Sequence, residues 1–153
     1  MASRRTDIKF KSFDTEQEWK WFHLYVPTPW AYDARGLIAY RDGTPIAGCV
    51  MQNFCAGSVE VHQAILKPTV IRHGWLELVA DVALANNRGS MYSLVSEDNE
   101  KALKLNKHIG FRETGRIPDG DHPGVDLVLL VLPRDECRYL KENRDGWRQD
   151  RGS

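Results

Sequence analysis

The chain has 153 residues, the size of one ordinary domain, and a globular composition with 42% hydrophobic and 27% charged residues. This composition argues against a wholly disordered chain. The 21 basic side chains balance 21 acidic ones, so the formal net charge is zero. A protein that binds nucleic acid mainly through its overall charge is expected to be more basic, although local basic patches stay open.

No run of about 18 apolar residues occurs, so a transmembrane helix is not expected. The polar stretch from Met1 to Asp7 lacks the apolar segment of a signal peptide. Cys49, Cys55 and Cys137 are odd in number and lack Cys-x-x-Cys spacing, which favours a reducing, cytoplasmic setting. The histidines and cysteines show no metal-ligand spacing, so no metal site is predicted.

Hydrophobic alternation and turn residues predict a strand, a helix and three strands in the first half of the chain. These elements are a strand at 8–13, a helix that begins near residue 15 and ends at Pro27 and Pro29, and strands at 36–40, 45–53 and 58–66. Asp14 or Thr15 is expected to cap the helix. The pair Asp42-Gly43 is a strong hairpin signal, so the consecutive strands are expected to be antiparallel.

The second half is predicted as alternating helices and strands that end in a pair of strands. The ranges are a helix at 72–86, a strand at 90–95, a helix at 100–108, and strands at 111–117 and 125–132 separated by a loop at 118–124. Asn99 is a natural N-cap and Gly110 a natural helix end. The predicted fold class is therefore α/β: one mixed, mostly antiparallel sheet covered by helices, forming a single domain at 6–142 before a polar tail at 143–153.

One block of the sequence resembles a known family. Asn99, Ala102 and Leu105, followed by Gly110-Phe111, are similar to the Asn-x-x-Ala-x-x-Leu block and Gly-Phe pair of the GNAT superfamily of acetyl-coenzyme A dependent N-acetyltransferases. The segments 113–116, 124–126 and 134–137 resemble the ending of ribosomal-protein-type and phage-encoded members. The resemblance covers about residues 36–140. It implies that two splayed strands form a cleft for acetyl-CoA.

The loop at 68–75 departs from the glycine-rich pyrophosphate loop of that family, because it contains a single glycine. If Arg72, His73 and Gly74 open the following helix, their amides and charged side chains can still bind phosphate. The alternative is a degenerate loop that does not bind. The residues expected to contact acetyl-CoA are Ile65, Leu66, Arg72, His73, Gly74, Trp75 and Asn99.

The resemblance also places a general base on the central strand. In many members a glutamate stands eight residues before the proline of the loop, which corresponds to Glu60 before Pro68. His62, two residues further, shares a strand face with Glu60, so the carboxylate could orient the imidazole. The structural explanation stays open: Glu60 could face solvent at a strand end, and His62 could be a satisfied core histidine.

Further residues bear on the predicted transfer of an acetyl group. Asn106 stands where the family often has a tyrosine acid, and an amide cannot donate a titratable proton. Trp30 and Tyr32, on a proline-flanked loop, are candidates for the substrate pocket. Three lysines recur at every third position on one helix and are either a solvated face or an attraction for the 3′-phosphate of the cofactor: Lys101, Lys104 and Lys107.

The resemblance thus implies an enzyme that transfers an acetyl group from acetyl-CoA directly to an amine in a ternary complex. The acceptor could be a protein amine, a small amine or a modified base, and a homodimer is left open as the assembly. The alternative is a catalytically silent binding or regulatory protein with the same fold and a phage origin. The single-glycine loop and Asn106 support that alternative.

Overall fold

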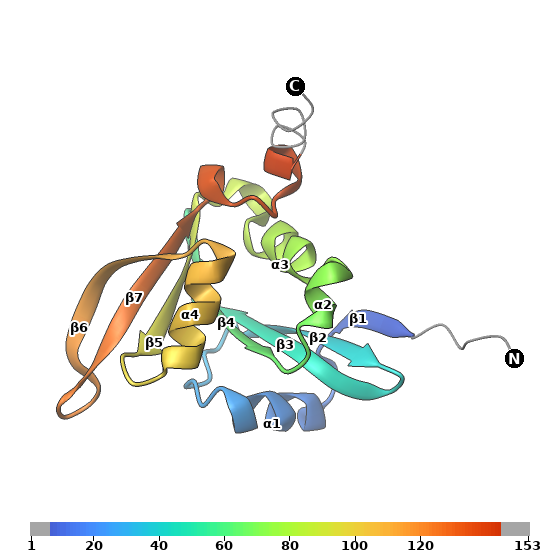
Figure 1. The fold of residues 1–153 in the computed structure, drawn as a ribbon, viewed down its shortest axis with the longest axis horizontal. Helices are drawn as coiled ribbons and strands as arrows, with labels where there is room; N and C mark the ends of the chain where they lie inside the picture. Colours follow the sequence, from blue (N-terminus) through green and yellow to red (C-terminus); the bar gives the residue numbers. More distant parts are fainter. Residues whose placement is uncertain (1–6, 145–153) are drawn as a thin grey trace, which may run out of the picture.

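The computed structural model describes residues 7–144 (Figure 1). The domain boundaries expected at 6 and 142 fall at the ends of this range, and most of the predicted tail at 143–153 lies outside the described residues. These boundaries therefore stay predictions.

The centre of the fold is a seven-stranded mixed sheet with the order β1-β2-β3-β4-β5-β7-β6. Its strands are β1 (Ile8–Ser12), β2 (Arg35–Arg41), β3 (Thr44–Gln52), β4 (Ser58–Ile65), β5 (Ser90–Ser96), β6 (Arg112–His122) and β7 (Val125–Pro133). Neighbouring strands of this sheet pair antiparallel except β4 and β5, which are parallel. The predicted fold class is confirmed.

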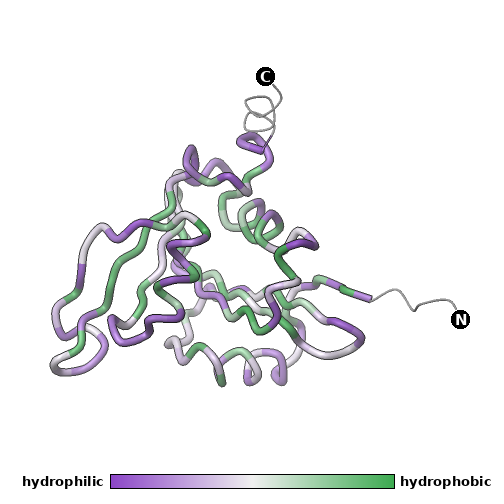
Figure 2. Tube along the Cα trace, in the orientation of Figure 1, coloured by the Kyte–Doolittle hydropathy of each residue, from purple (hydrophilic) through white to green (hydrophobic). Residues whose placement is uncertain are grey.

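Helices cover both faces of the sheet, with α1 on one side of β2–β4 and α2 and α3 on the other (Figure 1). The helices are α1 (Glu16–Tyr25), α2 (Thr69–Arg72), α3 (Trp75–Ala83) and α4 (Glu100–Ile109), with short 3-10 turns at Ala85–Asn87 and Arg134–Glu136. The larger core lies under α3 and α4, and its apolar residues concentrate on α3 and the central strands (Figure 2). A smaller core lies under α1, where Phe22 meets Val50 and Ala64.

Local signals in the sequence account for most element ends. Thr15 caps α1 in a capping box with Glu18, and Asn99 caps α4 by accepting from the Ala102 amide at 3.1 Å. The turn between β2 and β3 has positive φ at Asp42 (49°) and Gly43 (82°), as a type I′ hairpin requires.

Two predicted ranges are wrong. The helix expected at 72–86 is interrupted: α2 ends at Arg72, Gly74 adopts a left-handed conformation (φ 89°, ψ 19°), and α3 begins only at Trp75. The loop expected at 118–124 is mostly strand, because β6 continues to His122, which pairs with Val125 across a short turn. The polar residues that suggested a loop lie within β6, where the register with β7 is irregular between Ile117 and His122.

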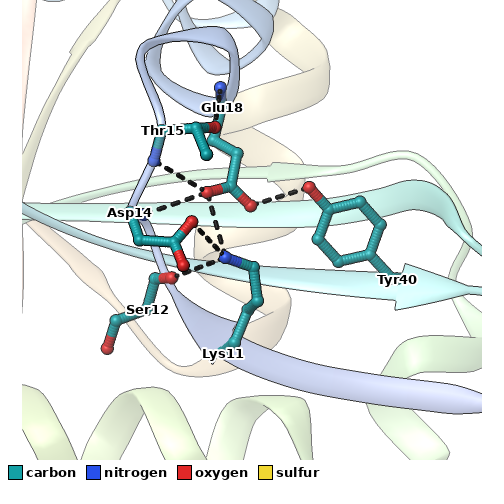
Figure 3. A network of polar contacts seen from close by, with 6 residues as sticks. All are labelled: Lys11, Ser12, Asp14, Thr15, Glu18 and Tyr40. Atoms are coloured by element: carbon teal, nitrogen blue, oxygen red, sulfur yellow. Dashed lines mark hydrogen bonds and ion pairs between the residues drawn. The ribbon is translucent and has the colours of Figure 1, made fainter.

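A polar network joins β1, the start of α1 and β2 (Figure 3). The buried Glu18 carboxylate accepts hydrogen bonds from the Tyr40 hydroxyl at 2.7 Å and from the Lys11 ammonium at 3.1 Å. The same carboxylate accepts from the amides of Asp14 and Thr15. The network fixes α1 on its face of the sheet.

Candidate functional site

Glu60 and His62 form a hydrogen-bonded pair on β4. His62 Nε2 lies 2.5 Å from Glu60 Oε1, and only 6% of Glu60 and 8% of His62 are exposed. Both side chains share a strand face with Ala64, which packs under α1. The expectation that Glu60 could face solvent is therefore wrong, and the predicted juxtaposition of the two residues is confirmed.

Three further polar side chains surround this pair. Asn53 Nδ2 donates to Glu60 Oε2 at 2.6 Å, and Thr28 Oγ1 lies 3.4 Å from His62 Nε2. Gln52, opposite Glu60 on β3, donates to Thr28 Oγ1 at 3.5 Å. Gln52, Glu60 and His62 are three of the five buried polar or charged residues among those described, so the polar groups of the interior concentrate here.

The hydrogen bonds determine the protonation of the pair. The hydrogen bond with His62 lowers the pKa of Glu60; burial opposes this effect and the donor from Asn53 supports it. Glu60 is therefore an anion and can only accept, so His62 Nε2 carries the proton in their shared hydrogen bond. Within residues 7–144, His62 Nδ1 makes no hydrogen bond, which leaves its lone pair available to accept a proton.

Tyr92 is a neighbour of this pair that sequence reasoning missed. It stands directly opposite Glu60 in the β4–β5 register. Burial raises the pKa of the Tyr92 phenol, and the nearby Glu60 carboxylate adds to the effect. A tyrosine in a predicted strand is ordinary, and only the register of the parallel pair would have singled it out.

Strands β4 and β5 separate just beyond this point. They pair at three consecutive residue positions, from Ser58 with Ser90 to Glu60 with Tyr92. At the far end of β4, the Leu66 amide donates to Ile46 on the β3 side at 2.8 Å. Because backbone groups alternate along a ladder, those of Ile65 point the opposite way, into the gap between β4 and β5. Ile65 is thus placed for the predicted backbone contact, whereas the Leu66 amide is already used.

The segment before α3 differs from the expected phosphate loop. Arg72 and His73 are exposed but precede α3, so they do not contribute its first amides. Trp75 begins α3, and its fully buried side chain donates from Nε1 to Gln63 Oε1 at 3.0 Å. Of the predicted phosphate contacts, Trp75 can therefore offer only its backbone amide, while Arg72 and His73 remain free to offer side chains.

The α4 residues also have structural roles. Asn99 is exposed and its side chain caps the helix, as expected. The Asn106 amide donates to the Ala102 carbonyl of its own helix at 2.8 Å. All three lysines of the series are exposed: Lys101, Lys104 and Lys107. A solvated face accounts for them without a ligand.

Trp30 and Tyr32 lie at the surface, 65% and 94% exposed, with ring centroids 6.3 Å apart. Trp30 lines a surface depression of about 650 Å³ together with Trp19 and His23 of α1. Tyr32 is not among its lining residues. The structure therefore places the two predicted pocket residues in contact with each other but in different surroundings.

Residues 7–144 contain no cluster of three His, Cys, Asp or Glu side chains that could bind a metal. Nor does any helix in that range have the length and apolar character needed to cross a membrane.

No family model and no curated protein matches the sequence. Solved structures do match. Spermidine N-acetyltransferase SpeG from Vibrio cholerae has a TM-score of 0.67 at 14% identity, over 88% of this chain and 97% of that one. The ribosomal-protein-S18-alanine N-acetyltransferase from Escherichia coli has a TM-score of 0.64 at 15% identity, over 83% and 94%. A GNAT-family protein from Desulfovibrio desulfuricans, described as an acetyltransferase, has a TM-score of 0.68 at 12% identity, over 84% and 99%.

Proposed function

We propose that this chain, which has the fold of GNAT acetyltransferases, is itself an N-acetyltransferase of that superfamily. It would transfer the acetyl group of acetyl-CoA directly to an amine in a ternary complex. The observation that carries the proposal is the buried Glu60–His62 pair, which lies where β4 and β5 begin to separate. Burying a carboxylate–imidazole pair costs free energy, and titratable groups in such surroundings are concentrated at functional sites.

The separated strands fit the donor. Unpaired backbone groups in a sheet need partners, and the amide-containing arm of acetyl-CoA can supply them along Ile65. Arg72 and His73 are the side chains that would meet its phosphates. Acetyl-CoA supplies an activated acetyl thioester when bound.

His62 acts as the general base in this proposal. A protonated amine cannot attack a thioester, so a base must remove its proton. His62 Nδ1 accepts one amine proton, while Glu60 holds Nε2–H and stabilises the imidazolium that forms. The nitrogen forms a bond to the acetyl carbon, the carbon–sulfur bond breaks, and sulfur leaves with the electron pair. The nitrogen, which still carries one proton too many after attack, gives that proton to the thiolate directly or through water, so that the products are the neutral amide, the free thiol of CoA and one proton held on His62.

The acceptor is proposed from the neighbours' names and the local surface. The structural neighbours include enzymes named for spermidine and for the alanine of ribosomal protein S18, so a polyamine and a peptide α-amine are the first acceptors to test. Trp30 at the surface depression would contact the acceptor. The reducing, cytoplasmic setting and the ribosomal-protein-type or phage-encoded subtype are part of the same proposal.

A silent binding protein is the second candidate. Two observations favour it: α2 and a left-handed Gly74 replace the glycine-rich loop, and the Asn106 amide is bonded within its own helix. Such a protein would bind acetyl-CoA, or a partner, without turnover.

The test combines binding with turnover on the full chain. Acetyl-CoA is added at up to millimolar concentration and the melting temperature is followed, because a ligand of the native state stabilises it. Release of free thiol is then measured with spermidine and with an alanine-initiated peptide. A raised melting temperature with thiol release that depends on His62 supports the enzyme. A raised melting temperature without thiol release favours the silent protein. An unchanged melting temperature overturns both the enzyme and a silent protein that binds acetyl-CoA.

A further inference from the structure

We propose that Asn53 and Asp33 are positioning residues for the Glu60–His62 pair. Asp33 holds the turn after β3 in the conformation that directs the side-chain amide of Asn53 toward the Glu60 carboxylate. The inference rests on the proposed function, since it assigns a role to the surroundings of its base. Neither residue was singled out from the sequence.

The contacts form a continuous chain from a distant loop to the base. Asp33 lies in the loop between α1 and β2. Its Oδ1 accepts a hydrogen bond from the backbone N–H of Asn53 at 2.9 Å, and its Oδ2 accepts one from the backbone N–H of Phe54 at 2.8 Å. The side chain of Asn53 then donates to Glu60 Oε2 at 2.6 Å. The other carboxylate oxygen of Glu60 meets His62 Nε2. Both oxygens of Glu60 are thereby fixed, and with them the plane of the carboxylate.

The backbone of Asn53 explains why Asp33 is needed. Asn53 has φ 55°, in the left-handed region that is unfavourable for residues with a Cβ and least so for Asn and Asp. Two consecutive amides bonded to one carboxylate hold this conformation. The Phe54 and Asn53 amides also lower the pKa of Asp33, so that it remains an anion and keeps accepting both.

The Asn53 donor affects proton affinity as well as geometry. A hydrogen bond to the anion stabilises Glu60 in its charged form. Without it, more of the negative charge of Glu60 acts on His62, and the pair holds a proton more strongly. The polar groups near the pair from other elements are Gln52 on β3, Thr28 in the loop after α1 and Tyr92 opposite Glu60 on β5. Asp33 and Cys55 act on Tyr92. Of these groups, Gln52 also lowers the pKa of Glu60 as a hydrogen-bonding side chain, but its effect is smaller than that of Asn53.

Asn53→Gly isolates the side-chain contact, because glycine adopts the left-handed conformation without strain. The matched control is Asn87→Gly, which also replaces an asparagine with positive φ (61°) but at an exposed site. We expect Asn53→Gly to lower kcat by roughly ten- to hundred-fold, as for loss of one hydrogen bond to a charged group, with KM changed less than kcat. The acid limb of the pH–rate profile should move to higher pH. Asp33→Ala should reproduce the direction of both effects.

The titration of the His62 ring, followed by NMR in the full chain, provides a readout that needs no turnover. Its midpoint should move to higher pH in Asn53→Gly and stay unchanged in Asn87→Gly. An unchanged midpoint in Asn53→Gly overturns the positioning role whether or not the protein transfers acetyl groups. If the midpoint moves but the wild-type protein releases no thiol with any acceptor, the positioning role stands and the proposed function fails.

Discussion

The hydroxyl of Tyr40 on β2 donates to the Glu18 carboxylate of α1 at 2.7 Å, which ties the first helix to the sheet (Figure 3). Burial alone would raise the pKa of Glu18. The hydrogen bonds from the Asp14 amide, Tyr40 and Lys11 outweigh burial and lower the pKa to about 2. Glu18 is therefore a buried anion whose partners come from three separate elements.

This pKa predicts how stability changes with pH. The folded-state pKa of about 2 lies below the ordinary 4.5, so the contribution of Glu18 is full above about 4.5 and is lost as the pH falls toward 2. Glu18→Gln should lower the free energy of unfolding at pH 7 by about 3 kcal/mol. Urea unfolding between pH 2 and 7 measures the difference, which should shrink as the pH falls. Glu16→Gln, at an exposed pair with Lys20, is the control, with an expected change of about 0.5 kcal/mol or less.

The two members of the base pair should behave differently when each is replaced. His62→Ala removes the proton acceptor and should lower kcat by roughly 100- to 10,000-fold. Glu60→Gln preserves the shape but removes the charge that stabilises the imidazolium, so the acid limb of kcat/KM should move to lower pH. Rates measured from pH 5 to 9 check both. If His62→Ala has wild-type rates across that range, another group is the base.

Gly74→Ala should destabilise the fold. Because Gly74 has φ 89°, a side chain there is strained even though the nearest atom to a new Cβ, Glu77 Oε2, is 3.9 Å away. The expected loss is about 1–2 kcal/mol of unfolding free energy. A continuous helix at 72–86, as expected from the sequence, would have given Gly74 helical dihedrals, which it does not have.

Denaturant unfolding of Gly74→Ala is compared with that of Gly57→Ala. Gly57 has no positive φ and no atom within 4 Å of a new Cβ, so its change should be near zero. Equal stability of the two variants would show that Gly74 is not left-handed in solution.

Trp75 and Trp30, both predicted from the sequence to contact ligands, should differ in how much stability is lost on conservative replacement. Trp75→Phe removes the donor to Gln63 and leaves space in a fully buried site, so it should cost about 2–3 kcal/mol. Trp30→Phe, at a side chain that is 65% exposed, should change stability by about 0.5 kcal/mol or less. Thermal unfolding of both variants tests the contrast, and a small loss for Trp75→Phe would contradict its core position.

Interactions between residues close in the chain allowed much of the fold to be predicted from the sequence. The hairpin at Asp42-Gly43 and the cap at Asn99 are as predicted, and Thr15 is the one of the two candidate caps that begins α1. Each of these features depends on residues within three positions. The shared face of Glu60 and His62 follows from the two-residue period of a strand. The same local logic failed where a left-handed Gly74 divided one apolar periodic segment into two helices.

The surroundings of that pair in the candidate site depend on long-range contacts. Asp33 reaches Asn53 across 20 residues of chain, Thr28 reaches His62 across 34, and Tyr92 meets Glu60 through the register of two parallel strands. No periodicity or spacing encodes such contacts, because they depend on which strands pair and on where a loop crosses the end of the sheet. The residue types and the two-residue strand period identify Glu60 and His62 as a candidate base pair, whereas the packing of the loop after α1 against the turn after β3 places the Asn53 donor on the second oxygen of Glu60.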